Sequence, residues 1–168
     1  KNGADETVRT GVRYTAQAPD TEGLAECELL AQEIAEKYKV EILLNTATVA
    51  PSDYTFVPEY QVSAYKKALQ ALDTAMARFP EDFFRIIGTS SQPRKLQISL
   101  VRYLQPARYD VPEADGGLQY WIQNSAYIAL EVGPDVERNF YHELCRAMDT
   151  YVYAHTAQYD LWPTKNPE

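Results

Sequence analysis

Two long segments carry apolar side chains at three- and four-residue spacing, which limits the chain to folds in which helices pack on a shared core. The first segment is residues 21–38, and the second is residues 58–79, which Pro80 ends. Short runs rich in branched or alternating apolar residues predict strands at 40–44, 96–100, 118–122 and 126–132. The order helix, strand, helix, strand, hairpin, helix predicts one α+β domain.

The last part of the chain predicts a hairpin followed by a helix. The two final strand segments are separated by Gln123-Asn124-Ser125, which favours a tight turn. Gly133-Pro134-Asp135 then opens a helix expected to reach about Thr156, because proline fits the first helical turn and an acidic residue favours its positive end. A short helix is expected at 82–87.

The remaining segments lack periodicity and are rich in turn-forming residues. Residues 45–57 and 105–117 are therefore predicted to be loops. Residues 1–20 predict a loose lead-in, with a short strand at Val12–Thr15, before a single domain at 21–168.

Composition excludes several classes of protein. A hydrophobic content of 45% in 168 residues suits a domain with a real core. Acidic residues number 24 against 16 basic ones, and the resulting net charge of −8 repels phosphate backbones, so no nucleic-acid partner is expected. No apolar run approaches the roughly 18 residues that a membrane-spanning helix needs. With only 2 histidines and 2 cysteines, neither a histidine-rich metal site nor a disulfide scaffold is possible.

The predicted last helix contains His142-Glu143, the first half of the helical zinc motif H-E-x-x-H. That motif places two histidines one turn apart on a single metal, and its glutamate acts as general base on the metal-bound water. Here the second histidine is replaced by Arg146, a permanent cation with no lone pair for a metal.

Helical spacing puts His142, Arg146, Asp149 and Tyr153 on one polar face. A purely structural alternative is that Glu143, Arg146 and Asp149 form an ion-pair ladder beside a packed histidine. A complete metal site is hard to build from this face. Asp149 lies about 10 Å along the axis from His142, and His155 projects from another face.

Two segments carry a resemblance to a known family. The segment from Phe140 to Tyr151 is similar to F-x-H-E-[LF]-x-H-x-x-D, and Trp162-Pro163-Thr164-Lys165-Asn166-Pro167 is similar to W-x-x-x-N-P. These patterns are typical of a zincin subgroup, the zinc-binding metallopeptidases of bacterial secreted proteins and lipoproteins, distantly akin to the catalytic domain of anthrax lethal factor. Upstream, about residues 20–132 match only in the order of elements.

The resemblance implies a zincin-like fold, with a twisted mixed sheet of about four to five strands and an edge hairpin. Two long helices and the C-terminal motif helix would pack on this sheet. It also implies His142 as the first zinc ligand and Glu143 as general base, while the second ligand falls on Arg146. The third ligand would lie beyond Glu168, so the domain is expected to be incomplete at its C-terminus. A secreted or cell-surface lipoprotein location is implied as well.

Three functions remain open at this stage. The first is a degenerate metallopeptidase in which His142 and Glu143 are vestigial, zinc is not bound, and the cleft binds a peptide or surface polymer. Strand addition to the hairpin would then use Tyr120, Ile122 and Tyr127. The second is an active zinc metallopeptidase with an unorthodox ligand set. The third is a structural domain of a larger exported protein with no site in use.

The two cysteines permit different predictions. Cys145 neighbours His142 along the chain, but the two side chains leave a helix in different directions, so a cysteine–histidine nucleophile is not favoured. A buried thiol at Cys145 is favoured instead. A disulfide between Cys27 and Cys145 is an open alternative.

Overall fold

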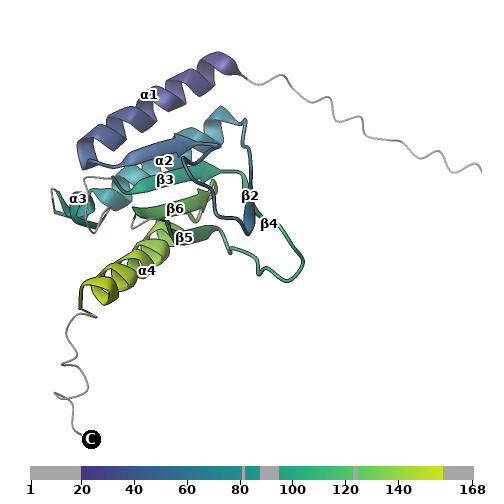
Figure 1. The fold of residues 1–168 in the computed structure, drawn as a ribbon. Helices are drawn as coiled ribbons and strands as arrows, with labels where there is room; N and C mark the ends of the chain where they lie inside the picture. The colour runs from purple at the N-terminus through teal and green to yellow at the C-terminus, as the bar shows by residue number, and fades with distance from the viewer. Residues whose placement is uncertain (1–19, 81, 88–94, 123–124, 157–168) are drawn as a thin grey trace, which may run out of the picture.

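A computed structural model describes residues 20–80, 82–87, 95–122 and 125–156 of the chain (Figure 1). The described helices are α1 (Thr21–Tyr38), α2 (Val62–Met76), α3 (Phe83–Ile87) and α4 (Val136–Thr156). The described strands are β1 (Glu41–Leu44), β2 (Tyr54–Val57), β3 (Gln97–Val101), β4 (Tyr103–Pro106), β5 (Gly117–Ile122) and β6 (Ser125–Glu131). The predicted α+β class is confirmed. The strand expected at Val12–Thr15 lies outside the described residues.

The main sheet has four strands in the order β1-β3-β6-β5. β1, β3 and β6 run parallel, whereas β5 pairs antiparallel with β6, so the sheet is mixed and ends in a hairpin. The predicted edge hairpin is therefore confirmed, with Ile122 opposite Ser125 at its closed end. No described strand pairs with the outer side of β5, which leaves that edge free.

A second sheet of two antiparallel strands, β2 and β4, corrects the prediction of loops at 45–57 and 105–117. Each strand has only four residues, and the turn-forming residues before β2 obscured its alternation. Phe56 packs on a small cluster that includes Leu104 of β4 and Ala129 of β6. The two-stranded sheet thus covers part of the sheet face opposite the helices.

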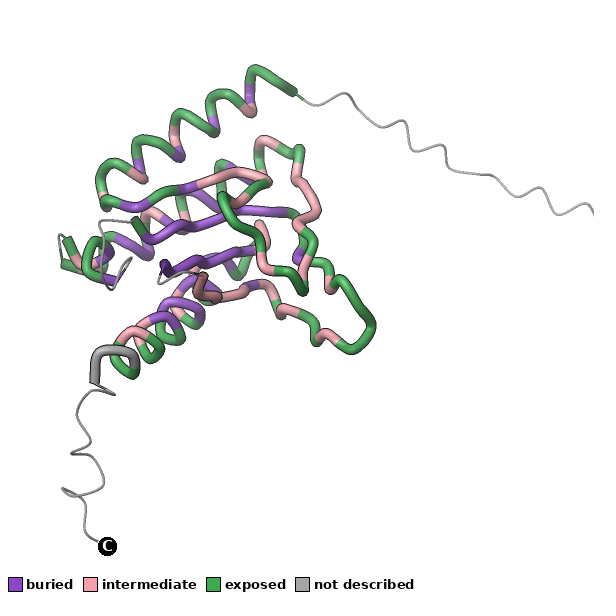
Figure 2. Tube along the Cα trace, in the orientation of Figure 1, coloured by how far each residue is buried: buried purple, intermediate pink, exposed green. Residues whose placement is uncertain are grey.

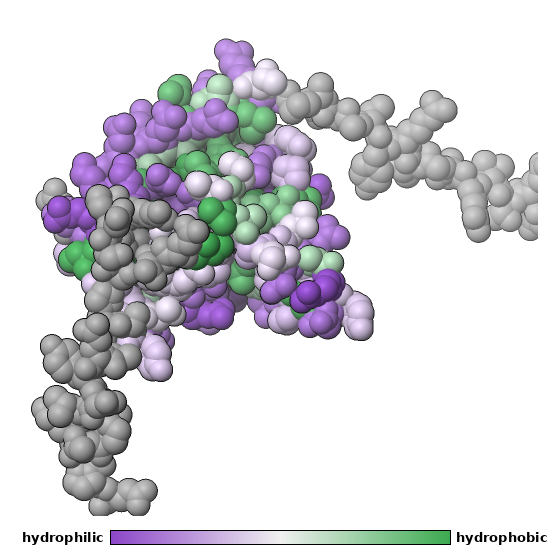
Figure 3. Space-filling view, in the orientation of Figure 1, coloured by the Kyte–Doolittle hydropathy of each residue, from purple (hydrophilic) through white to green (hydrophobic). Residues whose placement is uncertain are grey.

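The main core lies between the helices and the other face of the sheet (Figure 2). α2 lies between α1 and α4 and buries a continuous stripe formed by Tyr65, Ala68, Leu69, Leu72, Ala75 and Met76. β3 is buried on both faces because it lies between two strands and two packed layers. The outward face of α1 is hydrophilic (Figure 3). Among the described residues, no helix is both long enough and apolar enough to cross a membrane.

The ends of α1 follow the sequence, whereas the start of α2 does not. Asp20 caps α1 by accepting a hydrogen bond from the Gly23 amide at 3.0 Å. The predicted start of the second helix near residue 58 is wrong. The backbone N–H and C=O of Glu59 are both held at 2.7 Å by the Asn45 side chain, and this clamp keeps the segment out of the helix.

Candidate functional site

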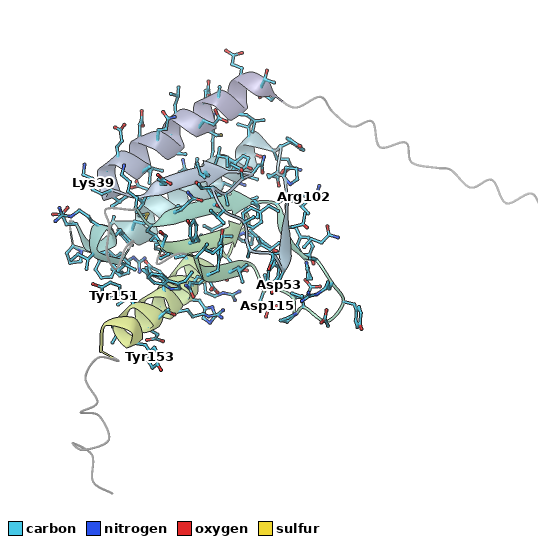
Figure 4. All side chains as sticks on the ribbon, in the orientation of Figure 1. Lys39, Asp53, Arg102, Asp115, Tyr151 and Tyr153 are labelled. Carbon is cyan, nitrogen blue, oxygen red and sulfur yellow. The ribbon has the colours of Figure 1, made fainter. Side chains whose placement is uncertain are left out.

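α4 separates a packed face from a polar one, as its spacing predicts. Phe140, Leu144 and Ala147 are buried against the sheet and α2. The side chains of His142, Arg146, Asp149 and Tyr153 are exposed. Figure 4 shows Tyr151 and Tyr153 leaving the helix on different sides, as residues two apart must. Tyr153 lies about 15 Å along the axis from Glu143, so it stands apart from the motif.

Glu143 is the buried member of the motif. Its side chain is only 3% exposed, whereas those of His142 and Arg146 are 70% and 55% exposed. His142 Nδ1 lies 2.9 Å from one carboxylate oxygen, and Arg146 Nη1 donates to the other at 3.4 Å. A buried carboxylate is expensive unless it is paired. The exposed side chains of His142 and Arg146 therefore pair with the buried Glu143 carboxylate where the core meets the surface.

Two glycines bring α4 close to the start of β5. A Cβ atom on Gly117 would lie 2.9 Å from Glu143 Cγ, and one on Gly116 would lie 2.3 Å from Asn139 Nδ2. Gly116 also has a φ of +87°, which side-chain-bearing residues rarely adopt. Because Gly116 faces Asn139 and Gly117 faces Glu143, β5 and α4 run in the same direction along their contact.

The residues present do not fit the zinc ion that the family resemblance implies. His142 turns Nδ1 toward Glu143, and the position of the second ligand carries the Arg146 guanidinium. In the described part of the chain, no group of three His, Cys, Asp or Glu side chains is placed to hold a metal. The side chain of His155, one suggested replacement, is outside the described residues.

The purely structural alternative also changes. A packed histidine is wrong, because His142 is mostly exposed. The expected ion-pair ladder has its first rung, between Glu143 and Arg146, but among the described residues Arg146 forms no ion pair with Asp149. Glu143 and Arg146 thus form a local ion pair, and the row of ion pairs along the helix that includes Asp149 is not formed among the described residues.

The outer edge of β5 runs beside this pair. Gly116 accepts a hydrogen bond from the Glu131 amide, and the alternation of antiparallel bonds then turns the N–H and C=O groups of Gln119 and Trp121 outward. The side chains of these two residues face α4, since Trp121 packs on the main core and Gln119 lies two residues before it. Their nitrogens, Nε2 and Nε1, are buried and have no hydrogen-bond partner in the part of the chain that the structure describes. Buried N–H groups are normally hydrogen-bonded, so these two nitrogens are available to donate to an acceptor.

Tyr120 and Tyr127, predicted to border the same cleft, lie on the other face of the sheet. Tyr120 packs on the cluster beneath the two-stranded sheet, and its ring stacks on Tyr127 with centroids 5.0 Å apart. Its hydroxyl donates to the carbonyl of Val49 at 3.0 Å, and burial raises its pKa above the ordinary value. By strand alternation Ile122 shares this face. The structure therefore does not bring these hairpin side chains together with His142.

The cysteines are both free. Cys27 is buried in α1, where desolvation raises the pKa of its thiol, and Cys145 is exposed on α4. The prediction of a buried thiol at Cys145 is wrong, because that position falls on the outer side of the helix. The structure contains no disulfide between these two residues.

Sequence reasoning missed the residues of β5 that face α4. The loop prediction is wrong for Gly117, which is the first residue of β5 and the contact point for Glu143. Gln119 and Trp121 were placed in a strand, but their alternation with Tyr120 does not reveal which face the helix covers. A separate hollow of about 480 Å³ lies at the start of α4, lined by Glu113, Asp115, Glu131 and Asp135 among others.

Comparison of the chain with protein-family models, curated proteins and solved structures finds no match. The site therefore rests on the geometry of the described residues: a strand edge that none of them pairs with, two donors that none of them satisfies, and a buried carboxylate paired with an arginine.

Proposed function

We propose that this chain is a peptide-binding domain derived from a zincin-like metallopeptidase, in which the free edge of β5 accepts an added strand. The observation that carries the proposal is the position of that edge beside the Glu143–Arg146 pair. In the family that the motif resembles, the same helix would carry a catalytic zinc. Here an arginine stands in the ligand position, which favours binding without cleavage.

Strand addition is supported by the backbone of β5. Gln119 and Trp121 present N–H and C=O groups outward, and an extended peptide pairs with such groups as a further strand of the sheet. Residue spacing on one side of a strand is about 6.7 Å, so the two residues supply one repeat of pairing. β5 has six residues, so a bound peptide would pair with it over a short stretch.

The competing function as an active zinc peptidase lacks a ligand set among the described residues. Peptide cleavage that needs zinc and disappears in Glu143→Ala would support it against our proposal. An exported location and a role within a larger surface protein are further proposals, resting on the family resemblance.

The proposal is tested by NMR with acetyl-Thr-Val-Thr-Val-carboxamide, a soluble peptide of residues that favour strands. Binding is expected to shift the amide resonances of Gln119 and Trp121 and to slow their hydrogen exchange. Related peptides with other side chains are titrated in the same way, so that a preference of the edge for particular side chains does not hide binding.

The variant that tests strand addition is Gln119→Pro. It removes a backbone N–H on the outer edge of β5 but no hydrogen bond between β5 and β6. This variant should fold and bind the peptide at least tenfold more weakly. If no peptide in the set perturbs β5, or if shifts gather elsewhere on the chain, strand addition at this edge is wrong.

A further inference from the structure

The contact between α4 and β5 contains more hydrogen-bond donors than acceptors. Gln119 Nε2 and Trp121 Nε1 are buried and have no hydrogen-bond partner among the described residues, and both side chains face the helix. Arg146 contributes a guanidinium whose five N–H groups have one acceptor, Glu143 Oε2, among the described side chains. The acidic group at this contact, the Glu143 carboxylate, already pairs with His142 and Arg146, and the Gln119 side-chain carbonyl is a further acceptor.

The donors of β5 and Arg146 of α4 can be compared by their positions along the common direction of the strand and the helix. From the contact of Gly117 with Glu143, β5 advances about 6.7 Å to Gln119, while α4 advances about 4.5 Å to Arg146. Strand and helix run in the same direction here, so Gln119 and Arg146 lie within about 2 Å of the same level along this shared direction, and Trp121 follows one repeat later. Arg146 already pairs with the Glu143 carboxylate. The remaining N–H groups of Gln119, Trp121 and Arg146 therefore have no unpaired carboxylate of the motif to donate to.

We infer that this donor-rich contact recognises a carboxylate carried by the peptide that adds to β5. The inference rests on the proposed function and specifies its ligand: an extended peptide with a carboxylate next to Arg146, at its C-terminus or on an Asp or Glu side chain. The half-exposed guanidinium receives the carboxylate first. Rotation of the flexible Gln119 side chain then brings its amide to the same oxygens.

The experiment compares three peptides by NMR titration of the full chain. These are acetyl-Thr-Val-Thr-Val with a free C-terminal carboxylate, the same peptide as carboxamide, and acetyl-Thr-Glu-Thr-Val-carboxamide. At least one carboxylate peptide is expected to bind about tenfold more tightly than the neutral one. The arm that gains affinity identifies the source of the carboxylate. The side-chain amide resonance of Gln119 should move downfield with that peptide and stay in place with the neutral one.

Variants separate recognition from folding. Arg146→Gln alone leaves Glu143 unpaired, so it is made together with Glu143→Gln, which removes both charges at once. This double variant should bind all three peptides alike. Arg85→Gln, a change of the same charge on α3, should keep the preference.

The outcomes distinguish the two proposals. Equal affinity of the three peptides, with shifts on the β5 edge, overturns carboxylate recognition and leaves strand addition in place. A preference that survives in the Glu143→Gln, Arg146→Gln variant also overturns it. Absence of binding by every peptide overturns both.

Discussion

Glu143 of α4 lies directly against Gly117 of β5, so close that a Cβ atom on the glycine would be 2.9 Å from Glu143 Cγ. The contact joins the motif helix to the edge strand at the point where the sheet is open. It also buries a carboxylate whose ion-pair partners among the described residues, His142 and Arg146, come from its own helix. The fold and the candidate site therefore depend on the same contact.

Gly117→Ala is expected to destabilise the protein by about 1 to 3 kcal/mol, because the added methyl group must displace the Glu143 side chain or move β5. Urea unfolding measures the loss. Gly133→Ala is the matched control, since its Cβ would meet no atom within 4 Å. Equal effects of the two substitutions would show that the close approach of β5 and α4 is absent in solution.

Arg146→Gln is expected to lower the free energy of unfolding by about 1 to 2 kcal/mol, because it leaves a buried carboxylate with a histidine alone. The loss is smaller than for a fully buried pair, since the guanidinium is half-exposed. In a Glu143→Gln background the same substitution should cost almost nothing. A full double-mutant cycle measures this coupling, and a coupling near zero would contradict the pairing.

The two thiols should react at very different rates with a thiol reagent such as dithionitrobenzoate. Cys145 is exposed and should react at once in the native protein, whereas Cys27 is buried and should react only on unfolding. Cys145→Ser should remove the fast phase and leave the slow one. Slow reaction of both thiols would contradict the exposed position of Cys145. Reaction of neither thiol before a reductant is added would indicate a disulfide and would also contradict this placement.

Stability near the α1–α2 contact should depend on acidic pH through Asp73. Lys37 Nζ and the Tyr38 hydroxyl both donate to its carboxylate, at 2.8 and 2.7 Å, and they hold the pKa of Asp73 below the ordinary value of 3.8. A lowered pKa stabilises the fold at pH values above the unfolded-state pKa, and the contribution disappears as the pH falls through the folded-state pKa.

The native protein should therefore be more stable than Asp73→Asn at pH 7, with the difference shrinking below about pH 4. Lys37→Gln should show the same trend, since it removes the ion pair from the other side. Unfolding midpoints measured from pH 7 to pH 2 check both variants. A difference that stays constant to pH 2 would contradict a role for the Asp73 charge.

The sequence predicts the helices and the main sheet well, because their patterns repeat over enough residues to define a face. The apolar stripe of α2 and the polar face of α4 follow directly from spacing. The sheet formed by β2 and β4 was missed, since each strand has four residues and their pairing joins segments far apart in the chain. Packing on Ala129 and its neighbours, which no local pattern reveals, contributes to holding this pair on the main sheet.

The candidate site could be predicted only in part. The motif identifies His142, Glu143 and Arg146, but helical spacing does not tell which of them is buried. That depends on Gly117, whose lack of a side chain makes room for Glu143. The hairpin prediction is confirmed, yet the face that α4 covers depends on strand register. Gln119 and Trp121 face α4, whereas Tyr120 and Tyr127, which the sequence associates with the motif helix, lie on the other face of the sheet.

Zinc binding by the intact chain is the most direct test of a domain that binds peptide without a metal. The protein is dialysed against zinc without chelator and its metal content is measured beside a His142→Ala variant. The two proteins should hold the same low amount of zinc, while Arg146→His, which restores the second histidine of the motif, should hold more. One zinc per native chain, lost in His142→Ala, would contradict the proposed function.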